Sequence, residues 1–533
     1  MMDMNGLVHS TAAKPSDAVP SLNFVKKFVD SCLGSEIEIE VLEALRERRI
    51  QKPTSEALQL LGHAIHDFGD QLPPLDVNRI TLILLNIIRH PDIISSNASV
   101  PVQNAGCQSK ILGLEMLRLT INALSQLVAQ ALVKISKENW LFMVKIMREL
   151  LETLTNGSEL IIEWKYSRLY SGVLQCLQNV LTDFKGPIGD NISGMVTSLL
   201  NFLDYGWNSS HLVSLTSQRI NEALSDTQGK NVRFTQAVYK PPHLRRGTVD
   251  KTSSQKIQNT KDGYNGKDVE RRVLLSDSDQ SDSDGAVGSQ DKFKCSKIRA
   301  LAVLNIQALA RAEPKSLHAY WTLLFPTHDI MNRRRLQTSL LNTLLYDPIL
   351  KVRMAAAATV SVMLESPSRA FIRMAEFKDA GKTGSFTTLS FSLGQVLVQL
   401  QRGLTHLALT ETNPGLLVAS LKALSLFVGS APFSRLPEEM LPNIVEALQK
   451  RVKSLLSSIN DQVNSLCMAI NCIGCALNSA PPSVHVAHML SKDSEIIQEG
   501  QLLQDLLVCT EAWVPTPVRV EALQVRIILC FFG

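Results

Sequence analysis

The helical architecture of this chain is clearest in one segment, LLYDPILKVRMAAAATVSVMLE, residues 344–365. Asp347 and Pro348 suit a helix start, because aspartate accepts from the free amides of the first turn and proline needs no N–H there. The apolar side chains that follow recur at three- and four-residue steps along one face: Val352, Ala355, Ala356, Thr359, Val360 and Met363. The pattern predicts a helix capped by Asp347, with alanines that let a neighbouring helix approach closely.

Four further segments repeat this pattern. They are CSKIRALAVLNIQALA with Ile298-Arg299, NPGLLVASLKALSLFV with Val418, NDQVNSLCMAINCIG with Val463, and TPVRVEALQVRIIL with Val518-Arg519. The apolar anchors at 298, 352, 418, 463 and 518 lie 54, 66, 45 and 55 residues apart, and Ala419 and Asn464 replace the arginine in two copies. No segment shows the sustained alternation of apolar and polar residues that a half-buried strand requires. The repeat therefore predicts an all-α array of helical hairpins.

The arrangement of Asp347, Pro348, Val352, Arg353, Ala355 and Ala356 resembles the HEAT consensus, whose unit is about 40–47 residues long. Over roughly residues 270–525, the order of LLSDSDQSDSDG, SKIRALAVLNIQALA, HAYWTLLFP, DPILKVRMAA, SRAFIRMAE and LLVASLKALSLFVGSAPFSRL is similar to the HEAT repeat-containing protein 6 family. The resemblance implies a HEAT/armadillo-type α-solenoid that includes a domain of unknown function, without an assigned enzymatic activity. Members of that family continue past the end of this chain, so we expect its last helical block to be truncated.

Composition divides the chain into four parts. We expect a disordered N-terminus at 1–21, an armadillo- or HEAT-like helical block at 22–224, a disordered charged linker at 225–292 and a HEAT-repeat block at 293–533. The linker is rich in Ser, Asp, Lys, Gly and Gln and poor in large apolar residues. Such a segment buries too little surface to offset the entropy lost on ordering.

The predicted linker carries two candidate interaction features. One is a linear motif that combines an aromatic ring, a Pro-Pro pair suited to polyproline II and positive charge, formed by Tyr239, Pro241, Pro242, His243, Leu244 and Arg245. It resembles a segment in the N-terminal tails of some RNA helicases, and the alternative is an ordinary solvated linker. The other is a set of serines next to aspartates, which predicts phosphorylation by an acidophilic kinase at Ser276 and Ser281, with Ser278 and Ser283 as secondary sites.

Motifs for metal or phosphate chemistry are weak in this sequence. Cys472 and Cys475 have the spacing of a zinc knuckle, but zinc needs two further ligands and the pair lies in an apolar helical run. The histidine pairs 63/66 and 485/488 lack the glutamate of a zinc-protease helix, and residues 380–383 (AGKT) lack the first glycine of a P-loop. We therefore expect no enzyme activity, no metal and no cofactor.

Charge and cysteine content limit the kinds of partner and the cellular compartment that we expect. Lys and Arg total 54 against 50 Asp and Glu, a near balance that gives no reason to expect nucleic acid as a direct ligand. Nine irregularly spaced cysteines favour a reducing compartment, and neither a signal peptide nor a membrane span is evident. We expect an intracellular protein of the cytoplasm or nucleus, without a small-molecule substrate.

Hairpin arrays present long surfaces that bind proteins through many contacts. The sequence thus predicts a scaffold or adaptor for protein partners that it does not identify. The alternative is a transport-receptor-like carrier of the importin type, which would need a cargo groove and a site for a small GTPase.

Overall fold

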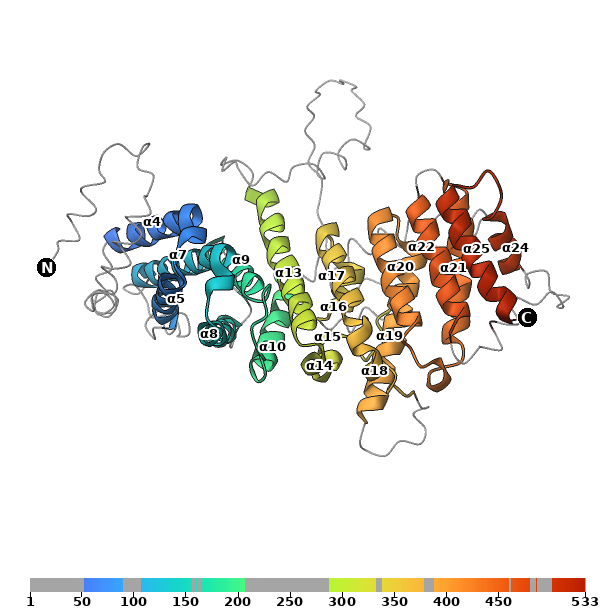
Figure 1. Ribbon diagram of the computed structural model, residues 1–533, viewed down its shortest axis with the longest axis horizontal. Helices are drawn as coiled ribbons and strands as arrows, with labels where there is room; N and C mark the ends of the chain where they lie inside the picture. Colours follow the sequence, from blue (N-terminus) through green and yellow to red (C-terminus); the bar gives the residue numbers. More distant parts are fainter. Residues whose placement is uncertain are drawn as a thin grey trace, which may run out of the picture. The chain divides into compact units, whose positions relative to one another are not determined.

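The computed structural model describes residues 52–89, 107–155, 160, 164–206, 287–331, 338–377, 388–459, 462–479, 486 and 501–532. Every regular element in these ranges is a helix (Figure 1). The helices before residue 207 and after residue 290 belong to one compact unit. The predicted all-α class is confirmed over this part of the chain, whereas the predicted disordered N-terminus at 1–21 lies outside it.

The helices fall into two layers that alternate along the chain. Layer A contains α5 (Pro74–Arg89), α8 (Lys137–Thr155), α10 (Asn191–Leu203), α16 (Leu340–Tyr346), α19 (Leu389–Thr410), α21 (Met440–Leu456) and α24 (Gln501–Val508). Layer B contains α4 (Lys52–Phe68), α7 (Cys107–Ala131), α9 (Trp164–Val180), α13 (Val287–Ala312), α17 (Leu350–Met363), α20 (Pro414–Val428), α22 (Val463–Leu477) and α25 (Thr516–Phe532). Each layer A helix and the layer B helix that follows it form one hairpin.

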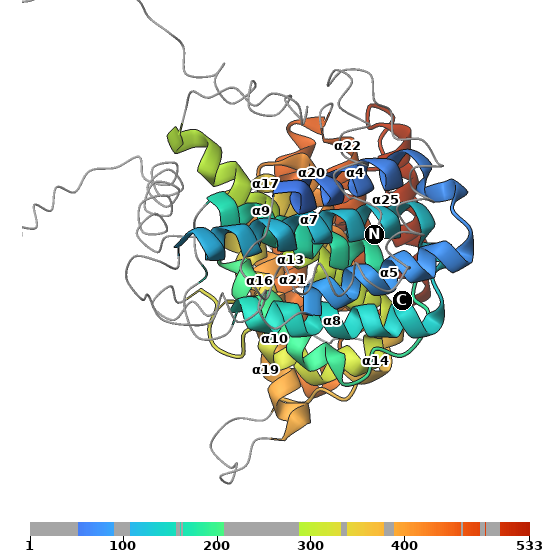
Figure 2. The ribbon, with the colours of Figure 1, turned by 90° about the vertical axis from the view of Figure 1, so that its left-hand side faces the viewer.

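Successive hairpins stack so that like helices touch. In layer B, α4 contacts α7, which contacts α9, while α17, α20, α22 and α25 contact one another in turn. In layer A, α5 contacts α8 and α8 contacts α10, and Figure 2 shows α4 and α7 side by side with α5 and α8 next to them. This stacking of hairpins is the predicted α-solenoid.

Two hydrogen bonds connect the layer B helices α9, α13 and α17 in the middle of the chain. Asn305 Nδ2 on α13 donates to the carbonyl of Leu174 on α9 at 2.9 Å. Thr359 Oγ1 on α17 donates to the carbonyl of Val303 on α13 at 3.4 Å. Because these side chains are buried, each bond satisfies a polar group that water does not reach.

The five segments that repeat in the sequence all become layer B helices: α13, α17, α20, α22 and α25. On α17, Val352, Ala356 and Thr359 are fully buried and Ala355 is partly buried against the core. The predicted apolar face is thus buried, and Thr359 on this face bonds to α13.

Short helices between hairpins account for the irregular repeat spacing. α14 (Pro314–Leu317), η4 (His318–Tyr320) and α15 (Trp321–Leu324) lie between anchors 298 and 352, and η6 (Ser366–Ser368) and α18 (Arg369–Ile372) between 352 and 418. Three other connections each contain a single turn of 3₁₀ helix: η1 (Gly69–Gln71), η2 (Leu132–Lys134) and η8 (Phe433–Arg435).

By length and hydropathy alone, Gly113–Lys134 would suffice to cross a bilayer. However, 56% of its most apolar window is buried inside the array, where α7 packs between α4 and α9. Such burial is typical of a core helix, so this segment is weak evidence for a membrane span.

The predicted linker falls inside a hairpin. Arg299 Nη1 on α13 donates to the carbonyl of Tyr205, just after α10, at 3.0 Å, which joins the two helices on either side of residues 207–286. Residues 207–286 themselves lie outside the described part of the chain. The predicted boundary at 293 is corrected, because α13 begins at Val287. Gln290 and Lys292 are good helix formers, which fits a helix that starts in this polar stretch.

Candidate functional site

The cysteines and histidines that were considered as metal ligands lie on helices. Cys472 is buried in α22 and Cys475 is half-buried one turn later, where its Sγ lies 3.9 Å from Asn471 Oδ1. Burial raises the pKa of the Cys472 thiol well above its usual value, which disfavours the thiolate that zinc requires. His63 and His66 are exposed on α4. Within the described residues, no group of three or more His, Cys, Asp or Glu side chains is placed to hold a metal ion.

Several predicted sites lie outside the described residues. They are the linear motif at 239–245, the phosphorylation candidates Ser276, Ser278, Ser281 and Ser283, the histidine pair 485/488 and the AGKT stretch at 380–383. They stay predictions.

The repeat-motif arginine of α13 forms a buried ion pair with the next hairpin. Arg299 donates from Nε to Asp347 Oδ2 at 2.7 Å and from Nη2 to Oδ1 at 3.2 Å, and both residues are 3% exposed. With the bond to the Tyr205 carbonyl, its guanidinium joins the middle of α13 to the C-terminal ends of α10 and α16. This two-pronged geometry is the strongest form of an arginine–carboxylate contact.

A second pair of the same kind follows on α17. Arg353 donates from Nη2 to Glu411 Oε2, and from Nε to the carbonyl of Leu344 on α16 at 2.9 Å. Both charged side chains are at most 8% exposed. The motif arginine of one layer B helix again binds its own layer A helix and the carboxylate that follows the next one.

Asp347 and Glu411 occupy equivalent places, although the repeat does not align them. Each immediately follows a layer A helix in extended conformation, with φ, ψ of −60°, 130° and −72°, 131°. Each accepts from the amide two residues ahead, Ile349 at 2.8 Å and Asn413 at 2.9 Å. Sequence reasoning missed Glu411, because the V-R-x-x-A frame aligns Asp347 with Asn413 instead.

The predicted helix cap at Asp347 is wrong. α17 begins at Leu350, after Ile349, which provides no side-chain cap, so Pro348 precedes the helix rather than opening it. The predicted geometry occurs one hairpin later, where Asn413 Oδ1 accepts from Leu416 N at 3.0 Å and Pro414 is the first residue of α20. The two-residue delay before α17 leaves the Asp347 carboxylate free to pair with Arg299.

A different set of contacts fixes the turns between the first three hairpins. Lys185 Nζ donates to the carbonyls of Leu132, Val133 and Ile135 at 2.6, 3.2 and 2.6 Å. Its ammonium thereby binds three carbonyls in and just after the η2 turn, of which that of Leu132 also accepts from Ile135 N at 3.1 Å.

Lys134 makes the same contact one hairpin earlier. Its Nζ donates to the carbonyl of Leu72 at 2.9 Å and to that of Asp70. Asn78 completes the joint, because its amide group donates to the Lys134 carbonyl at 3.1 Å and accepts from Ser136 N at 2.8 Å. Three consecutive turns are therefore joined by side chains that bond to backbone groups of the preceding or following turn.

One large apolar side chain is exposed in or directly after each bonded turn, with Leu75 in the first turn of α5. Leu75 is 63% exposed, Val133 86% and Phe184 40%. Phe184 is held edge-on against the buried Trp140 ring, with centroids 5.6 Å apart. A single exposed apolar residue is ordinary, whereas exposed apolar residues at three successive turns are a candidate protein-binding surface. We call Leu75, Val133 and Phe184 the turn ridge.

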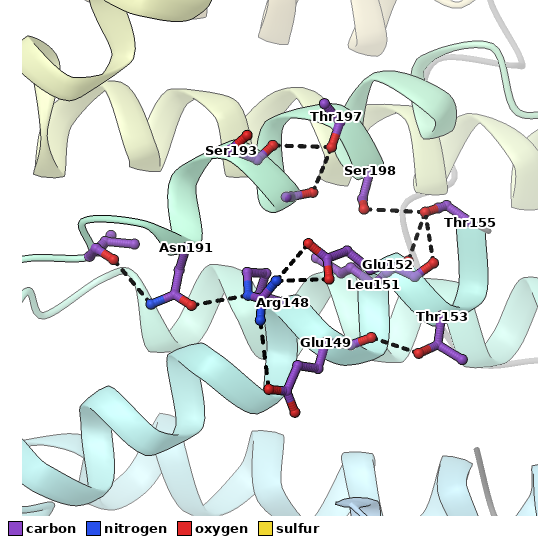
Figure 3. Close-up of polar contacts among 12 residues, drawn as sticks. Arg148, Glu149, Leu151, Glu152, Thr153, Thr155, Asn191, Ser193, Thr197 and Ser198 are labelled. Carbon is purple, nitrogen blue, oxygen red and sulfur yellow. Dashed lines mark hydrogen bonds and ion pairs between the residues drawn. The ribbon is translucent and has the colours of Figure 1, made fainter. Parts of the chain in front are cut away.

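The layer A helices next to the ridge are tied by a polar network (Figure 3). Arg148 on α8 donates from Nη1 to both oxygens of Glu152 at 2.8 Å and from Nε to Asn191 Oδ1, on α10, at 3.1 Å. Thr155 Oγ1 lies 3.2 Å from Ser198 Oγ at the far end of the same helix pair. Because these bonds join α8 to α10, the network supports the array.

Sequence reasoning did not identify the turn ridge or its lysines. The available signal was a lysine at equivalent places in two turns, LVKIS and DFKGP, each next to a large apolar residue. Without the stacking, nothing indicates that Lys185 reaches across to the preceding turn.

Two comparisons report similarities to known proteins. Residues 297–483, from α13 to just past α22, match the family model of a domain of unknown function, DUF4042. A solved structure concerned with tubulin recruitment and assembly by microtubule polymerases with tumor overexpressed gene (TOG) domain arrays covers 96% of this chain and 98% of that chain, at 12% identity and a TM-score of 0.17. So low a TM-score carries no argument about function, and the fold assignment as a helical-repeat protein comes from the helix layers described above.

Proposed function

We propose that this protein is a non-enzymatic helical-repeat scaffold or adaptor that binds protein partners through the turn ridge, and that it is related to the HEAT repeat-containing protein 6 family. The observation that carries the proposal is the exposure of large apolar side chains in or directly after three successive turns that side chains bond together. A preformed surface loses little conformational entropy when it binds a partner. The same stacking that buries the core thus supports a stable binding face.

The polar groups around the ridge support binding rather than catalysis. Lys134 and Lys185 donate hydrogen bonds to backbone carbonyls. Arg148 donates to Glu152 and Asn191 and forms an ion pair with Glu149. Groups engaged in this way position the ridge but leave little capacity to bind or activate a small substrate.

The test compares proteins that co-purify with the full chain and with a Leu75→Glu, Val133→Glu double variant. Both side chains are largely exposed, so the variant should fold while the two carboxylates disrupt an apolar contact. Leu389→Glu is the matched control, since Leu389 is 59% exposed at the start of α19, away from the ridge. We expect specific partners to be lost from the double variant alone.

Equal recovery of the same partners by both variants would remove the ridge as the binding surface. Recovery of nothing beyond general chaperones would reject the scaffold proposal itself. A small GTPase together with nuclear pore proteins among the partners would favour the carrier alternative.

A further inference from the structure

The middle of layer B carries exposed charge of one sign. α9, α17 and α20 contain no Asp or Glu, and α13 contains none after Asp291. The buried cations of these helices, Arg299 and Arg353, already form ion pairs within the array. Among the described side chains of the four helices, the exposed charged residues are all basic: Lys165, Arg168, Lys297, Arg311, Lys351 and Lys422. We call these six residues the layer B basic face.

Stacking brings three of these cations into a row. The hydrogen bond between α9 and α13 lies six residues after Arg168 and eight after Lys297. The bond between α13 and α17 lies six residues after Lys297 and eight after Lys351. Because the two layers alternate, the layer B helices run in the same direction, and neighbouring cations differ in level by about two residues, or about 3 Å. With helix axes about 8–10 Å apart, the three cations form a row about 16–20 Å long.

The cations of this row are available to a ligand. Lys297 and Lys351 are exposed and form no ion pair with any other residue that the structure describes. The acidic residue that borders the row is Glu115 on α7, and it is already bonded to Arg118 at 2.9 Å. The pKa of Glu115 is lowered by that bond and further by the charge of Arg168, so the positive field of the basic face extends to α7.

An acidic segment of this chain is tethered next to the row. Residues 274–285, LLSDSDQSDSDG, contain four aspartates and no Lys or Arg. They end directly before α13, which begins at Val287, and Lys297 lies ten residues, or about 15 Å, into that helix. The ten-residue stretch from Asp277 to Val287 extends at most about 33–36 Å. That length suffices to return to Lys297 and to reach the cation of a neighbouring helix about 8–10 Å away.

We propose that the acidic segment 274–285 docks on the layer B basic face of its own chain, with its aspartates against Lys297 and the cations of α9 and α17. Charge complementarity and the short tether select this occupant, because a tethered ligand is present at a high effective concentration. Phosphorylation of the predicted sites Ser276 and Ser281 adds about −1.5 to −2 charge each and strengthens the contact. The docked segment competes with acidic partners for this face, so the inference goes beyond the turn ridge and does not depend on it.

The first test is carbodiimide cross-linking of the full chain, which joins a carboxylate to a lysine amine in direct contact. Mass spectrometry of a mixture of unlabelled and ¹⁵N-labelled chains separates links within one chain from links between two. We expect links from the aspartates of 277–284 to Lys297 and Lys351, within single chains. Their yield should fall as the ionic strength rises, because salt screens exposed charges.

The second test measures affinity with a fluorescent peptide of residues 273–286. It should bind the native chain less tightly than a chain with Asp277→Asn, Asp279→Asn, Asp282→Asn and Asp284→Asn, in which the tethered competitor is neutralised. In that chain, Lys297→Gln with Lys351→Gln should weaken binding by about threefold to tenfold, the loss expected for two exposed ion pairs. Lys145→Gln with Lys315→Gln, two exposed lysines of α8 and α14, is the matched control for net charge. Phosphates on Ser276 and Ser281 of the peptide should tighten binding.

Three results would overturn the proposal. Cross-links confined to the lysines between 240 and 267 would place the segment elsewhere. Links that form between labelled and unlabelled chains would assign this face to a second copy. Equal weakening by the two lysine pairs, or equal peptide affinity of the native and the Asn-substituted chain, would reject docking on this face.

Discussion

Replacement of Asp347 by alanine distinguishes a helix cap from a buried ion pair. The carboxylate accepts from Arg299 Nε at 2.7 Å, from Arg299 Nη2 at 3.2 Å and from Ile349 N at 2.8 Å, and its side chain has no exposed area. Loss of a helix cap costs about 1 kcal/mol of unfolding free energy. Removal of one partner from a buried pair costs about 3–5 kcal/mol, because the other charge stays buried without compensation. We expect the larger value.

The assay is urea unfolding of the full chain, followed by far-UV circular dichroism, with amide exchange to report local opening of α16 and α17. Asn413→Ala is the matched control, because Asn413 caps α20 in the ordinary way and should cost about 1 kcal/mol. In an Arg299→Met background, Asp347→Ala should cost less by about 0.5–3 kcal/mol, since no buried cation is left unpaired. A cost equal to that of Asn413→Ala, unchanged by Arg299→Met, would refute the ion-pair interpretation.

Three further predictions concern single sites in the second half of the chain. Burial lowers the pKa of His318, so its neutral form contributes stability above the unfolded pKa of about 6.5, and this contribution is lost as the pH falls below that value and through the lower pKa of the folded state. The melting temperature should therefore drop more on acidification in the native chain than in His318→Gln, and equal drops would contradict this. Gly394→Ala should cost about 1–3 kcal/mol in urea unfolding, because a Cβ there would overlap the backbone carbonyl of Glu376; an unchanged midpoint would rule the overlap out. Ala356→Arg should severely lower the thermal midpoint by burying a charge at a fully buried position, whereas the exposed Ala358→Arg should change it little.

The sequence by itself determined the helices and their repeat. Apolar side chains at three- and four-residue steps define a helix face locally, so α17, α20 and α25 follow from their own residues. The burial of Val352 and Ala356 follows for the same reason, since a hairpin cannot bury its own apolar face and must stack. These features depend on short-range spacing, which the sequence states directly.

The tertiary structure decided which residues meet. Glu411 belongs to no sequence motif, yet it is the structural counterpart of Asp347. Both residues directly follow a layer A helix, and each binds the motif arginine of the preceding layer B helix. Likewise, Lys185 contacts the carbonyls around Val133 only once the hairpins are stacked. Such pairs lie tens of residues apart, and their register depends on how each hairpin packs on its neighbour. A buried charge is stable only next to an opposite charge. Which residue supplies that charge depends on how the hairpins pack together and cannot be seen in any local segment.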